Sequence, residues 1–139
     1  MEPESYVDVN VFVYWLGNHP TFGKLAYDWI KKIESSQRGK YITSSLTLYQ
    51  TLVILAGLTG KSMKDENLVR SVVDAIKNLP GLDIIPLSLD DLEKAVSLMK
   101  DYNLDYEDAL HLAVALRRKA KEIISNDEDF SNIPLKRIF

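Results

Sequence analysis

The chain is poor in metal-binding and redox side chains: it contains no cysteine and only two histidines, His19 and His111, which lie far apart. The absence of cysteine excludes disulfides, thiolate zinc sites and cysteine nucleophiles. A histidine-rich metal site is not expected either. Any metal must therefore be held mainly by oxygen atoms, which favours magnesium or manganese over zinc.

A long apolar run is also missing. No segment approaches the ~20 apolar residues that a membrane-spanning helix requires. The N-terminal stretch MEPES is not followed by the basic and apolar regions of a secretory signal. We therefore expect a cytoplasmic protein, and the length of 139 residues predicts one domain over positions 1–139.

Basic residues are outnumbered by acidic ones, 17 against 20, which gives a formal net charge of −3. This balance provides no whole-protein attraction for nucleic acid. The charges are unevenly placed, however, because the stretches LRRKAK and LKRIF are basic while LDYEDAL and SNDEDF are acidic. A local basic surface remains compatible with the composition.

Short apolar runs alternate with stretches of helical period along the whole chain. This alternation predicts βαβ units, a mainly parallel sheet and helices on both of its faces, which is an α/β/α sandwich. The expected strands cover 5–9, 41–43, 82–87, 122–125 and 135–139, the last at an edge of the sheet. The expected helices follow the first strand, with an interruption at 17–22, and then cover 23–35, 45–56, 64–79, 88–102 and 105–118.

The helix expected over 23–35 has apolar residues at four-residue spacing. Leu25, Trp29 and Ile33 follow this spacing, so we expect them to form its buried face. Trp29 and Tyr14 are expected in the core or at an interface. Nothing in the sequence itself supports base stacking on these rings.

The helix expected over 45–56 has recognisable signals at both ends. Ser44 or Ser45 can cap its N-terminus through a side-chain oxygen. Gly57 and Gly60 are expected to end it, because glycine commonly terminates helices. Both serines are better explained as caps than as nucleophiles, since no histidine and aspartate partners accompany them.

Three acids lie at the ends of the expected elements. Asp8 ends the first strand, Asp127 follows the fourth strand, and Asp108 lies in the first turn of the helix that leads into the fourth strand. Ligands of parallel sheets bind beyond the carboxyl ends of the strands, so these acids are expected to meet there.

Converging carboxylates repel one another, and a divalent ion between them would relieve the repulsion. Such an ion can stabilise charge that develops on phosphorus, which makes phosphodiester hydrolysis the natural reaction class. Each acid alone also has a simpler interpretation. Asp8 is suited to capping a helix, Asp108 to compensating a helix dipole, and Asp127 to a solvated turn.

Four stretches together resemble a known family: YVDVNVFVYWL, TSSLTLYQTLVIL, YEDALHLAVAL and IISNDEDF. They occur in the order found in PIN domains, the fold of many VapC-type toxin ribonucleases of prokaryotes, and they span nearly the whole chain. The resemblance implies a compact α/β/α sandwich around a parallel sheet. It also implies an endoribonuclease that depends on Mg²⁺ or Mn²⁺ and acts on RNA.

The resemblance further assigns roles to individual residues. Asp8, Asp108 and Asp127 match the acidic, metal-binding and catalytic positions of the family. Asn10 matches a polar position beside the first acid, and Asp129 matches a further acid that supports the site. Toxins of this family usually pair with a small antitoxin protein and often form homodimers, so both partners are expected.

Gln50 is a departure from the family pattern, which usually has glutamate at this position. An amide offers oxygen to a metal or a water molecule but carries no negative charge. The substitution therefore predicts weaker metal binding, and with it weakened or absent catalysis. An equally good interpretation is that Gln50 is a buried amide with satisfied hydrogen bonds.

Three further residues are candidates for a role near the site. His111 lies one turn after Asp108, but a packed and hydrogen-bonded core histidine is the simpler interpretation. Arg117 and Arg118, in LRRKAK, are weak candidates for contacts with the RNA backbone. A solvated helix end with favourable dipole placement explains them equally well.

Two other functions are compatible with parts of the pattern. The first is a PIN-like module that has lost its chemistry and binds RNA or protein, which Gln50 suggests. The second is a phosphoacceptor receiver domain, which is also a parallel α/β fold with clustered acids. The receiver requires paired acids after the first strand and a lysine after the last core strand, and YVDVNVF and IISNDEDF contain neither.

Overall fold

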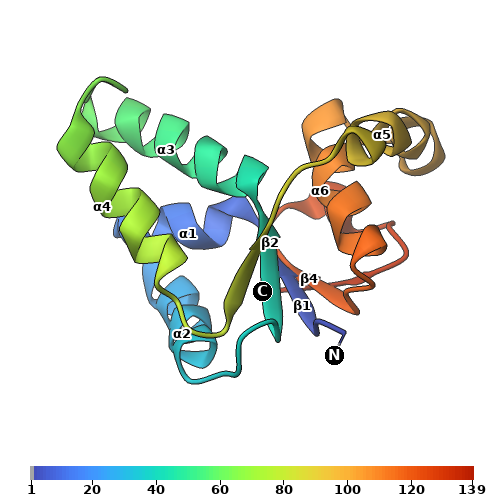
Figure 1. The fold of residues 1–139 in the computed structure, drawn as a ribbon, viewed down its shortest axis with the longest axis horizontal. Coiled ribbons are helices and arrows are strands. Elements are labelled where there is room, and N and C mark those ends of the chain that lie inside the picture. Colours follow the sequence, from blue (N-terminus) through green and yellow to red (C-terminus); the bar gives the residue numbers. More distant parts are fainter. Residues whose placement is uncertain (1) are drawn as a thin grey trace.

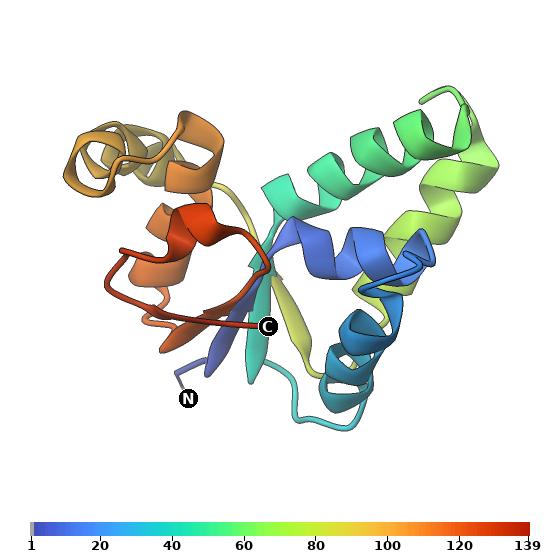
Figure 2. The same ribbon diagram turned by 180° about the vertical axis from the view of Figure 1, so that it is seen from behind.

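A computed structural model describes residues 2–139, in which a five-stranded sheet lies between two groups of helices (Figures 1 and 2). The strands are β1 (Ser5–Val7), β2 (Tyr41–Ser44), β3 (Leu82–Ile85), β4 (Glu122–Ile124) and β5 (Lys136–Ile138). The helices are α1 (Val9–Leu16), α2 (Gly23–Glu34), α3 (Ser45–Thr59), α4 (Glu66–Lys77), α5 (Leu89–Tyr102), α6 (Tyr106–Arg117) and the short 3₁₀ helix η1 (Glu128–Phe130).

The strands of the sheet are ordered β3-β2-β1-β4-β5, and every neighbouring pair is parallel. The predicted edge position of the last strand is confirmed. Parallel pairing brings all carboxyl ends of the strands to one edge, which we call the carboxyl edge. The segments after β1, β4 and β5 therefore leave the sheet side by side at this edge.

Each face of the sheet carries its own hydrophobic core, because successive side chains of a strand point to opposite faces. Tyr6, Ile42 and Ile123 pack with α5 and α6 on one face. Val7, Leu82 and Ile124 pack with α1, α2, α3 and α4 on the other face. The two helical layers lie on either side of the strands in Figures 1 and 2, and the predicted three-layer α/β/α sandwich is confirmed.

Capping side chains fix where several helices begin. Ser44 caps α3 by accepting a hydrogen bond from the Thr47 backbone N–H, as one of the two sequence interpretations expected. Ser88 and Asp91 form a capping box at α5, and Asp105 caps α6. These caps fix the residues at which α3, α5 and α6 begin.

The buried face of α2 matches the prediction at Ile33 but differs from it at Leu25 and Trp29. Its buried residues are Ala26, Ile30 and Ile33, whereas Leu25 is 41% exposed and Trp29 is only half-buried. A four-residue step advances 400° around a helix, so a run at this spacing drifts off one face by about 40° per step. Leu25 and Trp29 consequently lie at the side of the buried stripe rather than within it.

The end of α3 was predicted too early. Gly57 lies within the helix, and only Gly60, with φ of 67°, forms the left-handed C-terminal cap. Even at its full length of 15 residues, α3 is too short to cross a bilayer, and no other helix in residues 2–139 is long and apolar enough to do so.

Two glycines provide a matched stability prediction. A Cβ added to Gly57 meets nothing within 4 Å, so Gly57→Ala should raise the free energy of unfolding by about 0.5–1 kcal/mol. A Cβ on Gly81 would collide with the Ile33 carbonyl oxygen and approach the Ser36 Cβ to 2.9 Å. Gly81→Ala should therefore lower the free energy of unfolding by about 1–3 kcal/mol. Urea denaturation of both variants measures the pair, and equal effects would contradict the packing described here.

Candidate metal centre

Three segments bring acidic side chains to the carboxyl edge. Asp8 directly follows β1, and Asp127 lies three residues after β4. Asp108 lies in the first turn of α6, where its backbone N–H donates to the Asp105 carboxylate at 2.8 Å. These elements bring Asp8 together with two acids that follow it by 100 and 119 positions in the chain, around one end of the sheet.

The tightest acidic group consists of Asp108, Asp127 and Asp129. One carboxylate oxygen of each lies within 4.8 Å of the other two. Asp108 and Asp127 are half-buried and Asp129 is exposed. The sequence placed Asp129 in a supporting role, whereas in the structure it completes this group and Asp8 lies outside it.

Asp8 is buried beside the group and is fixed by two hydrogen bonds. Its Oδ2 accepts from the Ser125 hydroxyl at 2.6 Å, and its Oδ1 accepts from the Val9 backbone N–H at 2.8 Å. The Ser125 oxygen in turn accepts from the Asp127 backbone N–H at 3.0 Å. One serine hydroxyl therefore joins the acid after β1 to the acid after β4. Asp8 also caps α1, so the capping and site interpretations both apply to it.

Ser125 was missed by reasoning from the sequence, although the register of the strands contains a signal for it. Val7 pairs with Ile124 across the parallel β1–β4 ladder. The next residues, Asp8 and Ser125, must then leave the sheet as neighbours. Asn10 reinforces the junction, because its amide lies 3.5 Å from the Ser125 hydroxyl and its oxygen accepts from the Asn126 backbone N–H at 3.4 Å.

The electrostatics of the group are unfavourable without a cation. Burial, and after it the nearby carboxylates of Asp105, Asp127, Asp8 and Asp129, together raise the pKa of Asp108 to about 8. Within residues 2–139, no lysine or arginine forms an ion pair with any of these acids. An all-oxygen donor set with excess negative charge fits a hard divalent ion such as Mg²⁺ or Mn²⁺.

Gln50 lies in a hydrogen-bonded chain next to the acids. Its Nε2 donates to Glu107 at 2.8 Å, and its Oε1 lies 2.7 Å from His111 Nε2. A carboxylate only accepts hydrogen bonds, so the amide nitrogen must face Glu107 and the amide oxygen must face the histidine. His111 Nε2 therefore carries the hydrogen and donates it to Gln50.

The same chain fixes the state of His111. Its Nδ1 lies 2.7 Å from the Tyr6 hydroxyl and acts as the acceptor, because Nε2 already carries the ring hydrogen. Burial lowers the pKa of His111 and keeps the ring neutral. His111 is thus the packed, hydrogen-bonded core histidine that the sequence favoured. The chain Tyr6–His111–Gln50–Glu107 links β1, α6 and α3 across the carboxyl edge.

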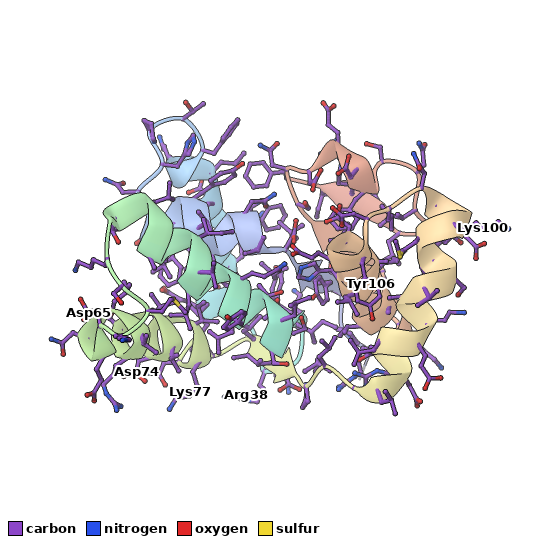
Figure 3. The ribbon with its side chains drawn as sticks, turned by 90° about the horizontal axis from the view of Figure 1, so that it is seen from above. Arg38, Asp65, Asp74, Lys77, Lys100 and Tyr106 are labelled. Atoms are coloured by element: carbon purple, nitrogen blue, oxygen red, sulfur yellow. The ribbon has the colours of Figure 1, made fainter. Side chains whose placement is uncertain are left out.

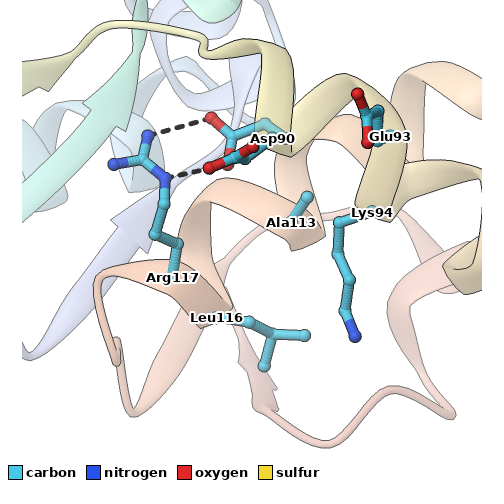
Figure 4. Close-up of a pocket in the computed structure, with 7 residues that line it drawn as sticks. Asp90, Glu93, Lys94, Ala113, Leu116 and Arg117 are labelled. Carbon is cyan, nitrogen blue, oxygen red and sulfur yellow. Dashed lines mark hydrogen bonds and ion pairs between the residues drawn. The ribbon is translucent and has the colours of Figure 1, made fainter.

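Arg117 is not at the acidic group. It lies nine residues after Asp108 in α6, which separates the two by about 13 Å along the helix axis. Its Nε and Nη2 contact the two oxygens of buried Asp91 at 2.8 and 2.9 Å, beside a hollow of about 590 Å³ (Figure 4). Burial acts to raise the pKa of Asp91, but hydrogen bonds from Arg117 and Ser88 outweigh it and lower the pKa. Arg118, the C-terminal cap of α6, is exposed.

Comparison with known proteins agrees with this architecture. The sequence profile described as PIN domain matches residues 5–136. No curated protein sequence matches the chain. Among solved structures, the sarcin-ricin loop cleaving toxin VapC20 of Mycobacterium tuberculosis superimposes with a TM-score of 0.73 at 13% identity, over 95% of this chain and 98% of that one.

Two solved toxin–antitoxin assemblies contain a similar chain. A toxin–antitoxin complex from Klebsiella pneumoniae gives a TM-score of 0.67 at 23% identity, over 98% of this chain and 97% of that one. VapBC2 from Rickettsia felis, bound to a DNA fragment from its promoter, gives 0.68 at 19% identity, over 96% of both chains. At these identities the likeness is one of fold.

The raised pKa of Asp108 predicts a pH-dependent stability. The folded chain holds this proton up to about pH 8, whereas the unfolded chain releases it near pH 4. The resulting stabilisation is complete below about pH 4 and is lost as the pH rises through about 8. In EDTA at pH 9, Asp108→Asn should therefore melt about 2–5 °C above the parent protein, and the difference should shrink as the pH is lowered and vanish by about pH 4.

The control for this measurement is Asp101→Asn, which removes an exposed acid from α5. It should leave the melting temperature unchanged at both pH values. Adding manganese at pH 8 should stabilise the parent and the control more than Asp108→Asn. A lower melting temperature of Asp108→Asn at pH 9 would show that the carboxylates are not repelling one another.

Proposed function

Because the chain belongs to the PIN domain family, we propose that it is a metal-dependent endoribonuclease that hydrolyses RNA phosphodiester bonds and acts as the toxin of a toxin–antitoxin pair. The observation that carries this proposal is the group of acids at the carboxyl edge, where burial and the neighbouring carboxylates together raise the pKa of Asp108 to about 8. A site with this much uncompensated charge is suited to a divalent cation.

We assign Mg²⁺ or Mn²⁺ to Asp8, Asp108 and Asp127, with Asp129 as a further acid at the exposed side. Bound there, the ion would supply positive charge that stabilises the phosphate as negative charge develops on it, and would make a water molecule a better nucleophile. Asn10 and Ser125 would hold the segments after β1 and β4 at a fixed separation, since both bridge these segments by hydrogen bonds.

An antitoxin protein is the proposed partner, by analogy with the assemblies from Klebsiella pneumoniae and Rickettsia felis. A homodimer is supported by α3, which has no charged residue over its 15 positions yet exposes Tyr49 and Leu58 by 60% and 68%. An uncharged apolar face is suited to contact with a second copy of itself. A mass of 15.8 kDa by light scattering would contradict the dimer. A cytoplasmic location accords with this role.

A second candidate function is a PIN-like module that binds RNA or protein with weak or no catalysis. It is favoured by the position of Gln50, whose amide is engaged by both His111 and Glu107 and adds no charge to the site. The two candidates differ in whether metal-dependent cleavage occurs, so the following measurements separate them.

Cleavage of a structured RNA with single-stranded loops tests the enzyme directly. The parent protein should cleave it in manganese, and Asp8→Asn should reduce the rate at least about 100-fold, because the ion loses a charged ligand and one of the two hydrogen bonds that Asp8 accepts is lost. EDTA should abolish cleavage in the parent. Equal rates of the parent and Asp8→Asn would attribute the activity to a contaminant and remove the enzymatic proposal.

Gln50→Glu tests whether the amide limits the site. The added charge should tighten manganese binding about tenfold, equivalent to ~1.4 kcal/mol, and raise the cleavage rate. In EDTA the same variant should be less stable than the parent, because the new carboxylate replaces an amide nitrogen 2.8 Å from Glu107.

Gln50→Ala is the matched control for this experiment, because it breaks the same hydrogen bonds without adding charge. It should lose stability while its manganese affinity stays at the parental value, measured by calorimetry. Unchanged manganese affinity in Gln50→Glu would mean that position 50 does not limit the site.

A further inference from the structure

Four partly exposed rings gather beside the candidate metal centre: Tyr14 of α1, His19 and Phe22 of the following loop, and Phe139 after β5. Neighbouring ring centroids lie 4.8 to 6.0 Å apart, and each ring is half-buried. Rings that meet at an exposed edge of the sheet provide stacking surfaces as well as packing. We call these four residues the ring cluster.

Direct contacts connect the ring cluster to the acidic group. The Asn126 side chain donates to the Tyr14 hydroxyl at 3.2 Å, and Asn126 immediately precedes Asp127. Phe139 follows β5, which pairs with β4, so it leaves the sheet at the same carboxyl edge. The ring cluster and the acidic group therefore lie at the same edge of the sheet, joined through Asn126.

The ring cluster continues into a groove along α2. A hollow of about 660 Å³ is lined by Leu25, Trp29, Lys32 and Phe139, together with Asp28, Lys31 and Ser35. Phe139 thus belongs to both the cluster and the groove. The groove floor contains the apolar side chains that α2 does not bury, which accounts for the exposure of Leu25.

Basic groups accompany these rings without carboxylate partners. Lys32 Nζ lies 4.3 Å from the Trp29 ring centroid, and Arg137 donates to the Ser125 carbonyl oxygen at 3.3 Å. Neither forms an ion pair within residues 2–139, whereas Lys31 is paired with Asp28. Arg137 therefore lies beside the segment that carries Asp127, whereas Lys32 lies in the last turn of α2, away from the acids.

His19 adds a hydrogen-bond donor at the junction. Its Nδ1 accepts from the backbone N–H groups of Thr21 and Phe22 at 3.1 and 3.0 Å, so the ring hydrogen is on Nε2. No group among residues 2–139 accepts that hydrogen. His19 thus combines a stacked ring with a free N–H, as a site for a nucleobase or a phosphate oxygen requires.

We propose that the ring cluster and the α2 groove bind a single strand of RNA that runs from the acidic group along α2. Bases would stack on His19, Phe139 and Trp29, while Lys32 and Arg137 would contact phosphates. Alternating rings and cations are the features that bind single strands with little sequence preference. This assignment rests on the proposed function and adds to it the form of the substrate and the path it takes.

A protein segment is the competing occupant of this groove. The charge pattern favours RNA, because Lys32 lies over the Trp29 ring, Arg137 lies beside the segment that carries Asp127, and neither cation has a carboxylate partner within residues 2–139. A duplex is disfavoured, because its paired bases could not stack on the rings.

Binding of a fluorescent, unstructured RNA oligonucleotide to the full chain in EDTA tests the proposal by anisotropy. Lys32→Glu should weaken binding about tenfold at low salt and reduce the slope of log Kd against log salt by about 0.7, the value for one phosphate contact on a single strand. His19→Ala should weaken binding at least about fivefold through lost stacking.

Lys100→Glu is the matched control, because it makes the same charge change at an exposed position of α5, on the other face of the sheet (Figure 3). It should bind within twofold of the parent, and melting temperatures should confirm that all variants fold. Equal affinities of Lys32→Glu and Lys100→Glu would overturn the proposal and leave a protein segment as the occupant.

The RNA-binding test is carried out without metal, so its result does not depend on whether the chain cleaves RNA. Loss of RNA binding in Lys32→Glu supports the RNA path even if the parent cleaves nothing in manganese. Manganese-dependent cleavage that Asp8→Asn abolishes, together with RNA binding that Lys32→Glu leaves unchanged, would overturn the RNA path and leave the nuclease proposal intact.

Discussion

The parallel pairing of β1 with β4 forces acidic segments together at the carboxyl edge, where their carboxylates repel one another. A parallel sheet sends the segments after β1 and β4 out side by side, because Val7 and Ile124 are in register. The acids that follow cannot separate without breaking that register. Ser125 keeps them together by donating to Asp8 and accepting from the Asp127 backbone. The remaining excess charge appears in the raised pKa of Asp108.

The neutral side chain of Gln50 keeps a further negative charge away from the carboxyl edge. A neutral amide joins Glu107 to His111, and the fixed direction of its hydrogen bonds places the ring hydrogen on Nε2 while burial keeps the histidine neutral. A glutamate at position 50 would put a further carboxylate against Glu107. The amide therefore contributes no negative charge to metal binding, but its hydrogen bonds to Glu107 and His111 connect α3 to α6. This connection also crosses between the two hydrophobic cores, because Tyr6 belongs to the core beneath α6.

Much of this architecture could be predicted because it follows from periodicity and chain order. Alternating strands and helices specify the parallel sheet, and its carboxyl edge collects Asp8, Asp108 and Asp127. The wrong predictions concern features that depend on how side chains pack in three dimensions. A four-residue spacing suggested the wrong face of α2, and Gly57 was tolerated inside α3 because nothing packs against it.

Side-chain partners were harder still to predict. Asp129 joins the tight acidic group and Asp8 turns to Ser125, and both arrangements depend on local hydrogen bonds. Arg117 could not be assigned to buried Asp91 from sequence alone, since the pairing depends on how α5 packs on α6.

The apolar residues that α2 and α3 leave exposed differ in the charges that surround them, and this difference indicates different partners. On α3, Tyr49 and Leu58 lie on a helix without any charge, so a partner surface there must be apolar as well. On α2, the exposed Leu25 and the half-buried Trp29 are accompanied by lysines and by the rings around Phe139. An apolar partner on that face would leave Lys32 buried without a counterion, which is costly. A polyanion with stackable bases meets both requirements of the α2 face, and a second copy of the chain meets those of α3.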